Sequence, residues 1–473
     1  MSFSADKQTT DDLNLLAKYK PGSVYSLFNT VRTRGGERLL DEMFRSPLSD
    51  HRAINERSDV FRYLSASPVT FPFTGQQISV VEDYVGMGGN SNGLAMTVSV
   101  GRLRLLEAAV NDKRYSIIRE GVEATVGFLQ GCRDFIGRFA PSGQSGQITG
   151  APALLASASS LPTGASSTLT GAPALLTGKW AAARAILDDH RLAGLPLQSA
   201  TGNMPWHRLA ALHHLFVHTL QSELTRLLEI LFHLDLYLAV SRVAREKGFS
   251  YAHALPEEDY IVRADDLRHP CLDKAMGNPV LLDRHRNVIF LTGANMAGKS
   301  TFMKSFGIAL YLAHMGFPVA ARDMVFSIRD GIYTSINVPD NLSLGYSHFY
   351  AEVQRVKAIA ESVGNSKSLV VIFDELFKGT NVKDAYDATL AITAAFAEYR
   401  NCGFIISTHI IEVGEVLREK YDNMQFAYLP TVMEGKTPRY TYKITEGITS
   451  DRHGMMIIEQ EGILEIIAVK KPG

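Results

Sequence analysis

A strand, a glycine-bounded loop and the start of a helix follow one another within residues 288–314, and this order constrains the fold more than any other part of the chain. The apolar run 288–291 leads into a loop of the form G-x-x-x-x-G-K-S, and a helical pattern continues to His314. Glycines at both ends let the backbone wrap a polyphosphate, and the helix N-terminus adds partial positive charge. A plain glycine turn is the alternative. The strand before the loop and the helix after it favour a phosphate-binding loop.

This loop supplies side chains that suit a nucleoside triphosphate and Mg²⁺. Lys299 is expected to reach the β- and γ-phosphates, and the Ser300 hydroxyl is expected to ligate Mg²⁺. The residues expected to surround the nucleotide are Gly293, Ala294, Asn295, Met296, Ala297, Gly298, Lys299, Ser300 and Thr301.

Two further apolar runs end in residues that suit triphosphate hydrolysis. The run 368–373 ends in Asp374 and Glu375, the pattern of a buried parallel strand whose carboxyl end faces a site. Asp374 is expected to hold Mg²⁺ through water, and Glu375 to polarise the water that attacks the γ-phosphate. Helix-cap acids after a core strand are the alternative. The run 404–408 ends in His409, which is predicted to sense the γ-phosphate, with a structural histidine as the alternative.

Composition sets broad limits on the function. The 473 residues are 46% apolar and 21% charged, which is ordinary for a globular protein of two or three domains. A net charge of −1 gives no global basic field, which weakens a DNA-binding hypothesis without excluding it. The three scattered cysteines show no metal-ligand spacing, and neither a signal peptide nor a membrane-spanning run is evident. A cytoplasmic protein without a membrane partner is predicted.

The first half of the chain has mainly helical patterns. Residues 12–130 are expected to be mostly helical, with an amphipathic helix ending before Pro47 and a new one starting at an N-cap, Ser49 or Asp50. Between residues 141 and 178 the composition shifts to Ser, Thr, Gly, Ala and Pro, and a seven-residue sequence at 149–155 recurs at 170–176. This segment predicts a flexible linker or a short β-turn excursion.

Residues 206–247 contain neither Gly nor Pro, and their leucines recur at helical spacing. One helix of about 60 Å is expected, ending at Gly248. A core or coiled-coil helix and a lever that carries motion between sites are both consistent with this pattern. The histidines on it (His213, His214, His218 and His233) are expected to be surface or packing residues rather than metal ligands.

From residue 260 onward, β-rich runs alternate with helical patterns, which predicts an α/β domain with a mainly parallel sheet. The runs 424–429 and 439–444 flank Gly435 and Lys436. These two runs predict an antiparallel hairpin at the edge of the sheet.

With these motifs in place, the sequence resembles the MutS family. The resemblance rests on the loop 293–301, the pattern Ser347-x-Phe349-x-x-Glu352, Asp374-Glu375, Gly379-Thr380 and Ser407-Thr408-His409, and upstream on residues 29–40, 47–48, 54–57, 234–244 and 268–270. Ala294 and Ala297 replace the usual proline and glycine of the loop. Phe377-Lys378 and Asn381 replace the usual Gly-Arg and Ser of the loop after Glu375, which bears on its contact with the nucleotide of a partner subunit.

The resemblance implies a multidomain α plus α/β fold. It predicts a helical core and lever domain over residues 1–255, with 141–178 as a linker or reduced clamp, followed by an ABC-type P-loop ATPase domain over 256–473 with a mixed, mainly parallel sheet. The N-terminal mismatch-recognition domain of the family is expected to be absent. The implied cofactors are ATP and Mg²⁺. The implied assembly is a homodimer in which Ser347 of one subunit completes the site of the other, and Asn381 lies at the nucleotide.

Three classes of function follow. The first is a DNA-binding ATPase that acts on branched, mismatched or distorted duplex in mismatch repair or recombination control. An ABC-type transport ATPase is the second, and the lack of an LSGGQ-like loop and of a membrane segment argues against it. The third is a nucleotide-gated protein-interaction scaffold that does not bind DNA directly.

Overall fold

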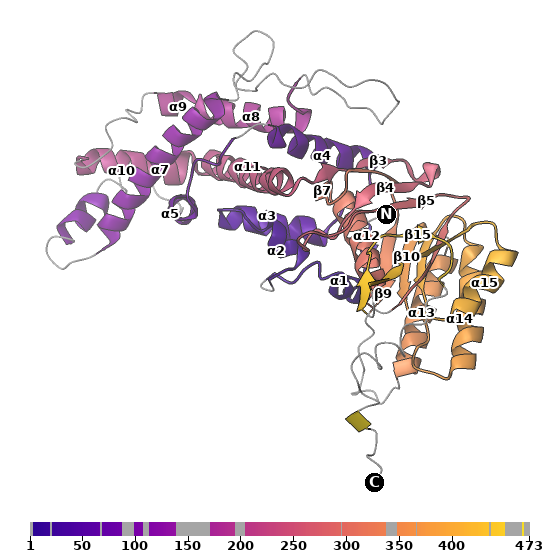
Figure 1. The fold of residues 1–473 in the computed structure, drawn as a ribbon. Coiled ribbons are helices and arrows are strands. Elements are labelled where there is room, and N and C mark those ends of the chain that lie inside the picture. Colours follow the sequence, from indigo (N-terminus) through magenta and orange to yellow (C-terminus); the bar gives the residue numbers. More distant parts are fainter. Residues whose placement is uncertain are drawn as a thin grey trace. The chain divides into compact units, whose positions relative to one another are not determined.

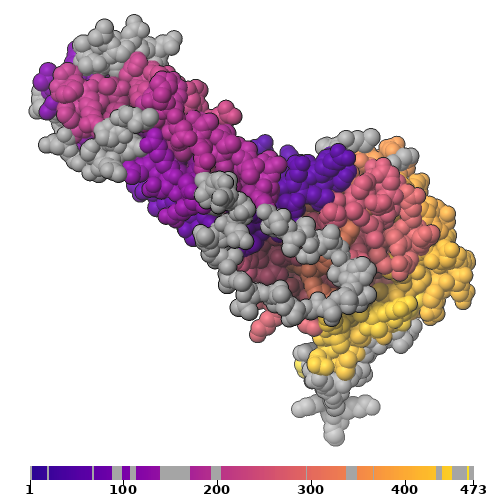
Figure 2. Space-filling view, turned by 90° about the horizontal axis from the view of Figure 1, so that it is seen from above, coloured from indigo at the N-terminus to yellow at the C-terminus, as the bar shows by residue number. Residues whose placement is uncertain are grey.

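The computed structural model describes residues 3–18, 21–66, 69–87, 99–106, 113–138, 171–193, 204–294, 296–336, 348–365, 367–434, 437–449 and 466–467. Two compact units are present. The first comprises Met1–Leu27, Met43–Ser58 and Val243–Gly473, and the second comprises Phe28–Glu42 and Asp59–Arg242. The described residues of the first unit that follow Val243 are the red, orange and yellow atoms of the space-filling view (Figure 2).

A seven-stranded sheet organises the first unit, in the order β1-β9-β10-β11-β6-β12-β15. All neighbours are parallel except β12 and β15. The strands are β1 (Ser4–Ala5), β9 (Gly331–Ser335), β10 (Leu369–Asp374), β11 (Gly403–Ser407), β6 (Val288–Thr292), β12 (Met424–Tyr428) and β15 (Thr445–Glu446). Every residue of β6 and β11 is buried, as expected for parallel strands that are covered on both faces. The predicted mixed, mainly parallel sheet is confirmed.

Helices cover both faces of this sheet. The helices are α12 (Lys299–His314), α13 (His348–Gly364), α14 (Val382–Ala397) and α15 (Ile411–Lys420). Helices α13, α14 and α15 lie together on one side, where their apolar residues pack against Val371, Phe373 and Phe404 (Figure 1). Helix α12 packs on the opposite face, since a side chain at Gly307 would meet Ile372.

Smaller strands surround the main sheet. A four-stranded sheet has the order β3-β8-β4-β5, and two-stranded pairs are formed by β2 with β7 and by β13 with β14. Their bounds are β3 (His253–Leu255), β8 (Asp323–Ser327), β4 (Val262–Leu267), β5 (Asn278–Leu282), β2 (Ser250–Tyr251), β7 (Pro318–Val319), β13 (Thr431–Glu434) and β14 (Thr437–Tyr440), with a 3-10 turn η3 (Glu257–Asp259).

An antiparallel hairpin is formed as predicted, but its first strand is β13 and not the expected run 424–429. Strand β13 pairs with β14, whereas residues 424–428 form β12, which pairs in parallel with β6 inside the main sheet. Apolar alternation identified 424–428 as a strand but could not identify its partner, because pairing with β6 is a contact between distant parts of the chain.

The N-terminal helices follow the sequence pattern closely. Their bounds are α1 (Lys7–Asp12), α2 (Val24–Phe28), α3 (Arg34–Arg45) and α4 (His51–Ser65). Helix α3 ends before Pro47. The Asp50 carboxylate accepts a hydrogen bond from the Ala53 backbone N–H at 2.8 Å, which confirms Asp50 as the N-cap of α4.

The expected domain boundary between residues 255 and 256 stays a prediction, and the compact units divide the chain differently. The unit that contains the sheet starts again at Val243 and also includes residues 1–27 and 43–58. Strand β1 explains part of this difference, because it pairs with β9 across more than 320 residues of sequence.

The second unit is helical. Its helices are α5 (Gly75–Val85), α7 (Arg114–Gly137), α8 (Ala174–Leu187), α9 (His190–Ala193), α10 (Trp206–His214), the π-helical segment η2 (Leu215–Thr219) and α11 (Gln221–Lys247) as far as Arg242. The single helix predicted over 206–247 is therefore two α-helices joined by a π-turn, which leucine spacing alone does not reveal. Gly248, at φ +65°, ends α11 as predicted. Of the segment 141–178, residues 141–170 lie outside the described part, and 174–178 begin α8.

Buried Asp235 on α11 organises the polar interior of the second unit. Its carboxylate accepts hydrogen bonds from the backbone N–H of Arg32 at 2.9 Å and of Thr33 at 2.8 Å, and from the Thr33 hydroxyl at 2.8 Å. Its exposed fraction is 2%.

Among the described residues, no helix is both long and apolar enough to cross a membrane.

Replacement of Asp235 by alanine should destabilise the protein by about 2–4 kcal/mol, because several buried donors would lose their acceptor. Denaturant unfolding followed by circular dichroism measures this change. Asp83→Ala is the matched control: its partner Arg34 lies 4.0 Å away and both side chains are about two-thirds exposed, so less than about 0.5 kcal/mol is expected. Equal effects of the two variants would contradict this role of Asp235.

Candidate nucleotide-binding site

The glycine-bounded loop lies between the carboxyl end of β6 and the start of α12, as its sequence predicts. Gly293 and Gly298 have φ of +138° and +105°, backbone conformations that side chains rarely adopt. A Cβ at Gly293 would lie 3.3 Å from the Leu429 carbonyl oxygen. Both glycines are therefore required by the backbone path as well as by the motif. Asn295 lies outside the described residues.

Lys299 is folded back into the loop. Its Nζ donates hydrogen bonds to the carbonyl oxygens of Gly293 at 2.7 Å and Ala294 at 3.2 Å, and the residue is 4% exposed. Burial lowers the pKa of Lys299, and the nearby carboxylates Glu375 and Asp374 partly offset this effect. A buried ammonium group that donates to backbone carbonyls favours an anionic partner, because an anion would compensate its charge more fully.

Asp374, at the end of β10, is held by two hydroxyl groups. Ser300 Oγ donates to one carboxylate oxygen at 2.5 Å, and Ser407 Oγ donates to the other at 2.5 Å. The two serines come from α12 and β11, so three elements contribute to the cluster. A carboxylate next to a hydroxyl is an oxygen donor set that suits Mg²⁺. The residues expected to hold the metal are thus brought together.

Glu375 and His409 form the second polar pair of the site. His409 Nε2 lies 2.5 Å from Glu375 Oε1, and both side chains are partly exposed. The hydrogen bond from His409 holds the pKa of Glu375 below its ordinary value, although burial opposes this effect. Glu375 has φ +58°, and its backbone N–H donates to the Ser407 carbonyl at 3.0 Å. An ionised carboxylate held in a strained backbone conformation suits a role in catalysis.

The other predicted site residues have different surroundings. Met296 has φ +69° and is 77% exposed, Ala297 is buried, and Thr301 is exposed. Asn381 caps α14: its side-chain oxygen accepts from the Asp384 N–H at 3.0 Å. A contact of Asn381 with nucleotide stays a prediction. Ser347 lies outside the described residues.

Tyr442 is a site residue that the sequence motifs did not indicate. A Cβ at Gly298 would lie 3.0 Å from its ring, so the ring lies against the phosphate-binding loop. Its backbone is anchored by Asn278, whose side-chain N–H donates to the Tyr442 carbonyl at 2.9 Å. The ring is 47% exposed. Residue 442 lies in the part of the sequence assigned to the hairpin, and only the fold brings it to the loop.

Replacement of His409 by alanine should raise the pKa of Glu375, because the ionised carboxylate would lose the hydrogen bond that stabilises it. A pH titration of the glutamate carboxylate by carbon-13 NMR measures this change. His253→Ala is the control, since His253 is exposed on β3. An unchanged pKa of Glu375 in the His409 variant would contradict this interpretation of the pair.

The C-terminal part of the chain is similar to known proteins. Residues 289–471 match the model of MutS domain V. The DNA mismatch repair protein MutS of Lactococcus lactis subsp. cremoris (strain SK11) is 29% identical over 236 residues, 49% of this chain and 28% of that protein. That of Listeria monocytogenes serotype 4b (strain CLIP80459) is 30% identical over 208 residues, 43% of this chain and 24% of that protein.

A third relative, the DNA mismatch repair protein MutS of Thermotoga maritima, is 29% identical over 200 residues, 41% of this chain and 25% of that protein. The chain thus spans about a quarter of the length of these relatives. Domain V includes the phosphate-binding loop from Gly293 onward, the acidic pair after β10 and His409. Residues 289–471 of this chain are therefore a domain of the MutS domain V family.

Proposed function

We propose that the chain is a Mg²⁺-dependent ATPase of the MutS type. The observation that carries the proposal is the convergence of Lys299, the Ser300–Asp374 pair and the Glu375–His409 pair at the carboxyl ends of β6, β10 and β11. Each of these residues was expected from its motif alone to act on a triphosphate. Their assembly at one edge of the sheet gives each of them access to the same bound phosphates.

Binding of ATP would exchange the partners of Lys299. Its ammonium group would leave the carbonyls of Gly293 and Ala294 for the β- and γ-phosphates, while the N–H groups at the start of α12 face the same phosphates. Ser300 and Asp374 would hold Mg²⁺, which when bound neutralises charge that develops on the phosphates. Asn295, Met296, Ala297 and Thr301 complete the predicted loop around the nucleotide.

Glu375 and His409 would act on the attacking water. The hydrogen bond from His409 lowers the pKa of Glu375, and its carboxylate can accept a hydrogen bond from water. His409 would hold the carboxylate in place and contact the γ-phosphate. Tyr442, whose exposed ring lies against the loop, would contact the base of the nucleotide through its ring face.

The proposed active form is a homodimer. Ser347 of one subunit would complete the nucleotide site of the other, and Asn381 would lie near the same interface. The exposed apolar side chains Met296, Tyr350 and Val382 support an intersubunit contact, because they belong to the loop, to α13 and to α14 around the site.

The proposed role of ATP hydrolysis is the control of DNA binding in mismatch repair or recombination. The names of the relatives support a DNA substrate, and α11 in the second unit would act as the lever. A nucleotide-gated scaffold that does not bind DNA remains the second candidate. The net charge of −1 favours it, because no general attraction to phosphates follows from this composition.

Glu375→Gln should retain ATP binding and lower the rate of hydrolysis by at least about a hundredfold, because the amide cannot polarise water as a carboxylate does. Steady-state phosphate release and the affinity for a fluorescent ATP analogue measure the two effects. Glu415→Gln is the matched control, since Glu415 is exposed on α15. Undiminished phosphate release by Glu375→Gln would remove Glu375 from the proposed role.

The two candidate functions differ in the salt dependence of DNA binding. If DNA is bound through even about two phosphates, the affinity should fall roughly tenfold between about 50 and 200 mM salt. Fluorescence anisotropy with plain, mismatched and four-way-junction DNA measures this dependence. Absence of binding at low salt to all three would exclude the DNA-binding function and favour the scaffold.

A further inference from the structure

The N-terminal segment of the chain covers the free edge of the main sheet. Strand β1 pairs in parallel with the first half of β9, with Ser4 opposite Gly331 and Ala5 opposite Ile332. Helix α1 continues along the same edge through side chains: Thr9 Oγ1 accepts from the Thr334 N–H at 3.0 Å. An uncovered edge strand would expose unpaired N–H groups, so this segment completes the sheet.

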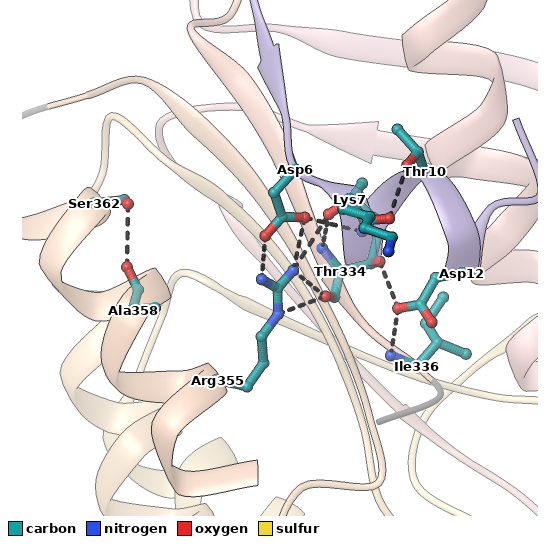
Figure 3. A network of polar contacts seen from close by, with 10 residues as sticks. Asp6, Lys7, Thr10, Asp12, Thr334, Ile336, Arg355, Ala358 and Ser362 are labelled. Atoms are coloured by element: carbon teal, nitrogen blue, oxygen red, sulfur yellow. Dashed lines mark hydrogen bonds and ion pairs between the residues drawn. The ribbon is translucent and has the colours of Figure 1, made fainter. Parts of the chain in front are cut away.

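Asp12, at the end of α1, holds the last residues of β9. Its carboxylate accepts from the Thr334 hydroxyl at 2.7 Å and from the Ile336 N–H at 2.9 Å (Figure 3). Asp12 is 5% exposed. A buried carboxylate thus fixes the chain at the point where it leaves the sheet.

Asp6, at the start of α1, holds helix α13. The guanidinium group of Arg355 forms a bidentate ion pair with the Asp6 carboxylate, and its Nε donates to the Thr334 carbonyl at 3.0 Å (Figure 3). The Arg355 side chain is only 10% exposed. A buried bidentate pair of this kind fixes orientation as well as distance.

Asp6 therefore holds α13, and Asp12 holds the end of β9. Residues 337–347 lie between these two elements in the sequence. Strand β9 ends just before these residues and α13 begins just after them. The aromatic pair Phe349 and Phe377, with ring centroids 6.0 Å apart, links the first turn of α13 to the residues that follow Glu375. The N-terminal segment is thus connected through α13 to the catalytic end of β10.

We propose that the β1–α1 segment is a positioning element of the ATPase, in which Asp6 and Asp12 fix α13 and β9 and, through the contact of Phe349 with Phe377, the residues that follow Glu375. This inference rests on the proposed function. Asp6 acts through Arg355 and does not touch substrate. Its loss should therefore slow hydrolysis and leave nucleotide binding by the loop unchanged.

Asp6→Asn tests the ion pair with Arg355 while it keeps the cap of α1. The amide oxygen can still accept from the Thr9 N–H, a hydrogen bond of 2.9 Å that caps α1, while the charge that pairs with Arg355 is lost. We expect kcat to fall roughly ten- to a hundredfold with unchanged ATP affinity. Hydrogen exchange of α13 amides should become faster. Lys7→Ala is the matched control, because Lys7 is an exposed charge in the same segment.

Failure of this inference is separable from failure of the proposed function. A wild-type protein that does not hydrolyse ATP would overturn the proposed function and, with it, the catalytic role of the β1–α1 segment. Hydrolysis in the wild type with unchanged kcat and unchanged α13 exchange in Asp6→Asn would overturn only the positioning role.

Discussion

Strands β10, β11 and β6 lie side by side in parallel, and the candidate site depends on this arrangement. Each strand ends at the same edge, so one strand provides Asp374 and Glu375, the next provides Ser407 and leads to His409, and the third leads into the glycine-bounded loop. The three strands are buried on both faces, and of their residues only Asp374, the last of β10, is partly exposed. Hydrogen bonds of 2.5 Å from two serines to Asp374 then connect the three elements.

The same sheet also explains how distant segments reach the site. Strand β12 on one side of β6 is followed by the hairpin and Tyr442, whose ring reaches Gly298. On the other side, β9 carries the β1–α1 segment at the outer edge of the sheet. Residues near both ends of the described chain therefore belong to the first unit. Substitutions in the N-terminal segment are expected to act on the chemistry through α13 and β9.

Local sequence was sufficient to predict elements whose determinants lie within a few residues. The loop and α12, the N-cap Asp50, the end of α11 at Gly248 and the strands that end in Asp374 and Ser407 all depend on short-range geometry. Prediction failed where the deciding contact was remote. Residues 424–428 pair with β6 rather than within a hairpin, and the predicted long helix is interrupted by a π-turn.

The sequence by itself determined the candidate residues for phosphate, Mg²⁺ and water. The spacing of Gly293, Gly298, Lys299 and Ser300 and the adjacent acids Asp374 and Glu375 are properties of continuous segments. The tertiary structure alone decided which of them meet. The pairing of Glu375 with His409, the ring of Tyr442 at the loop and the ion pair of Asp6 with Arg355 join residues separated by 34, 144 and 349 positions. Such contacts depend on the order of strands in the sheet, and a local pattern of residue types does not encode that order.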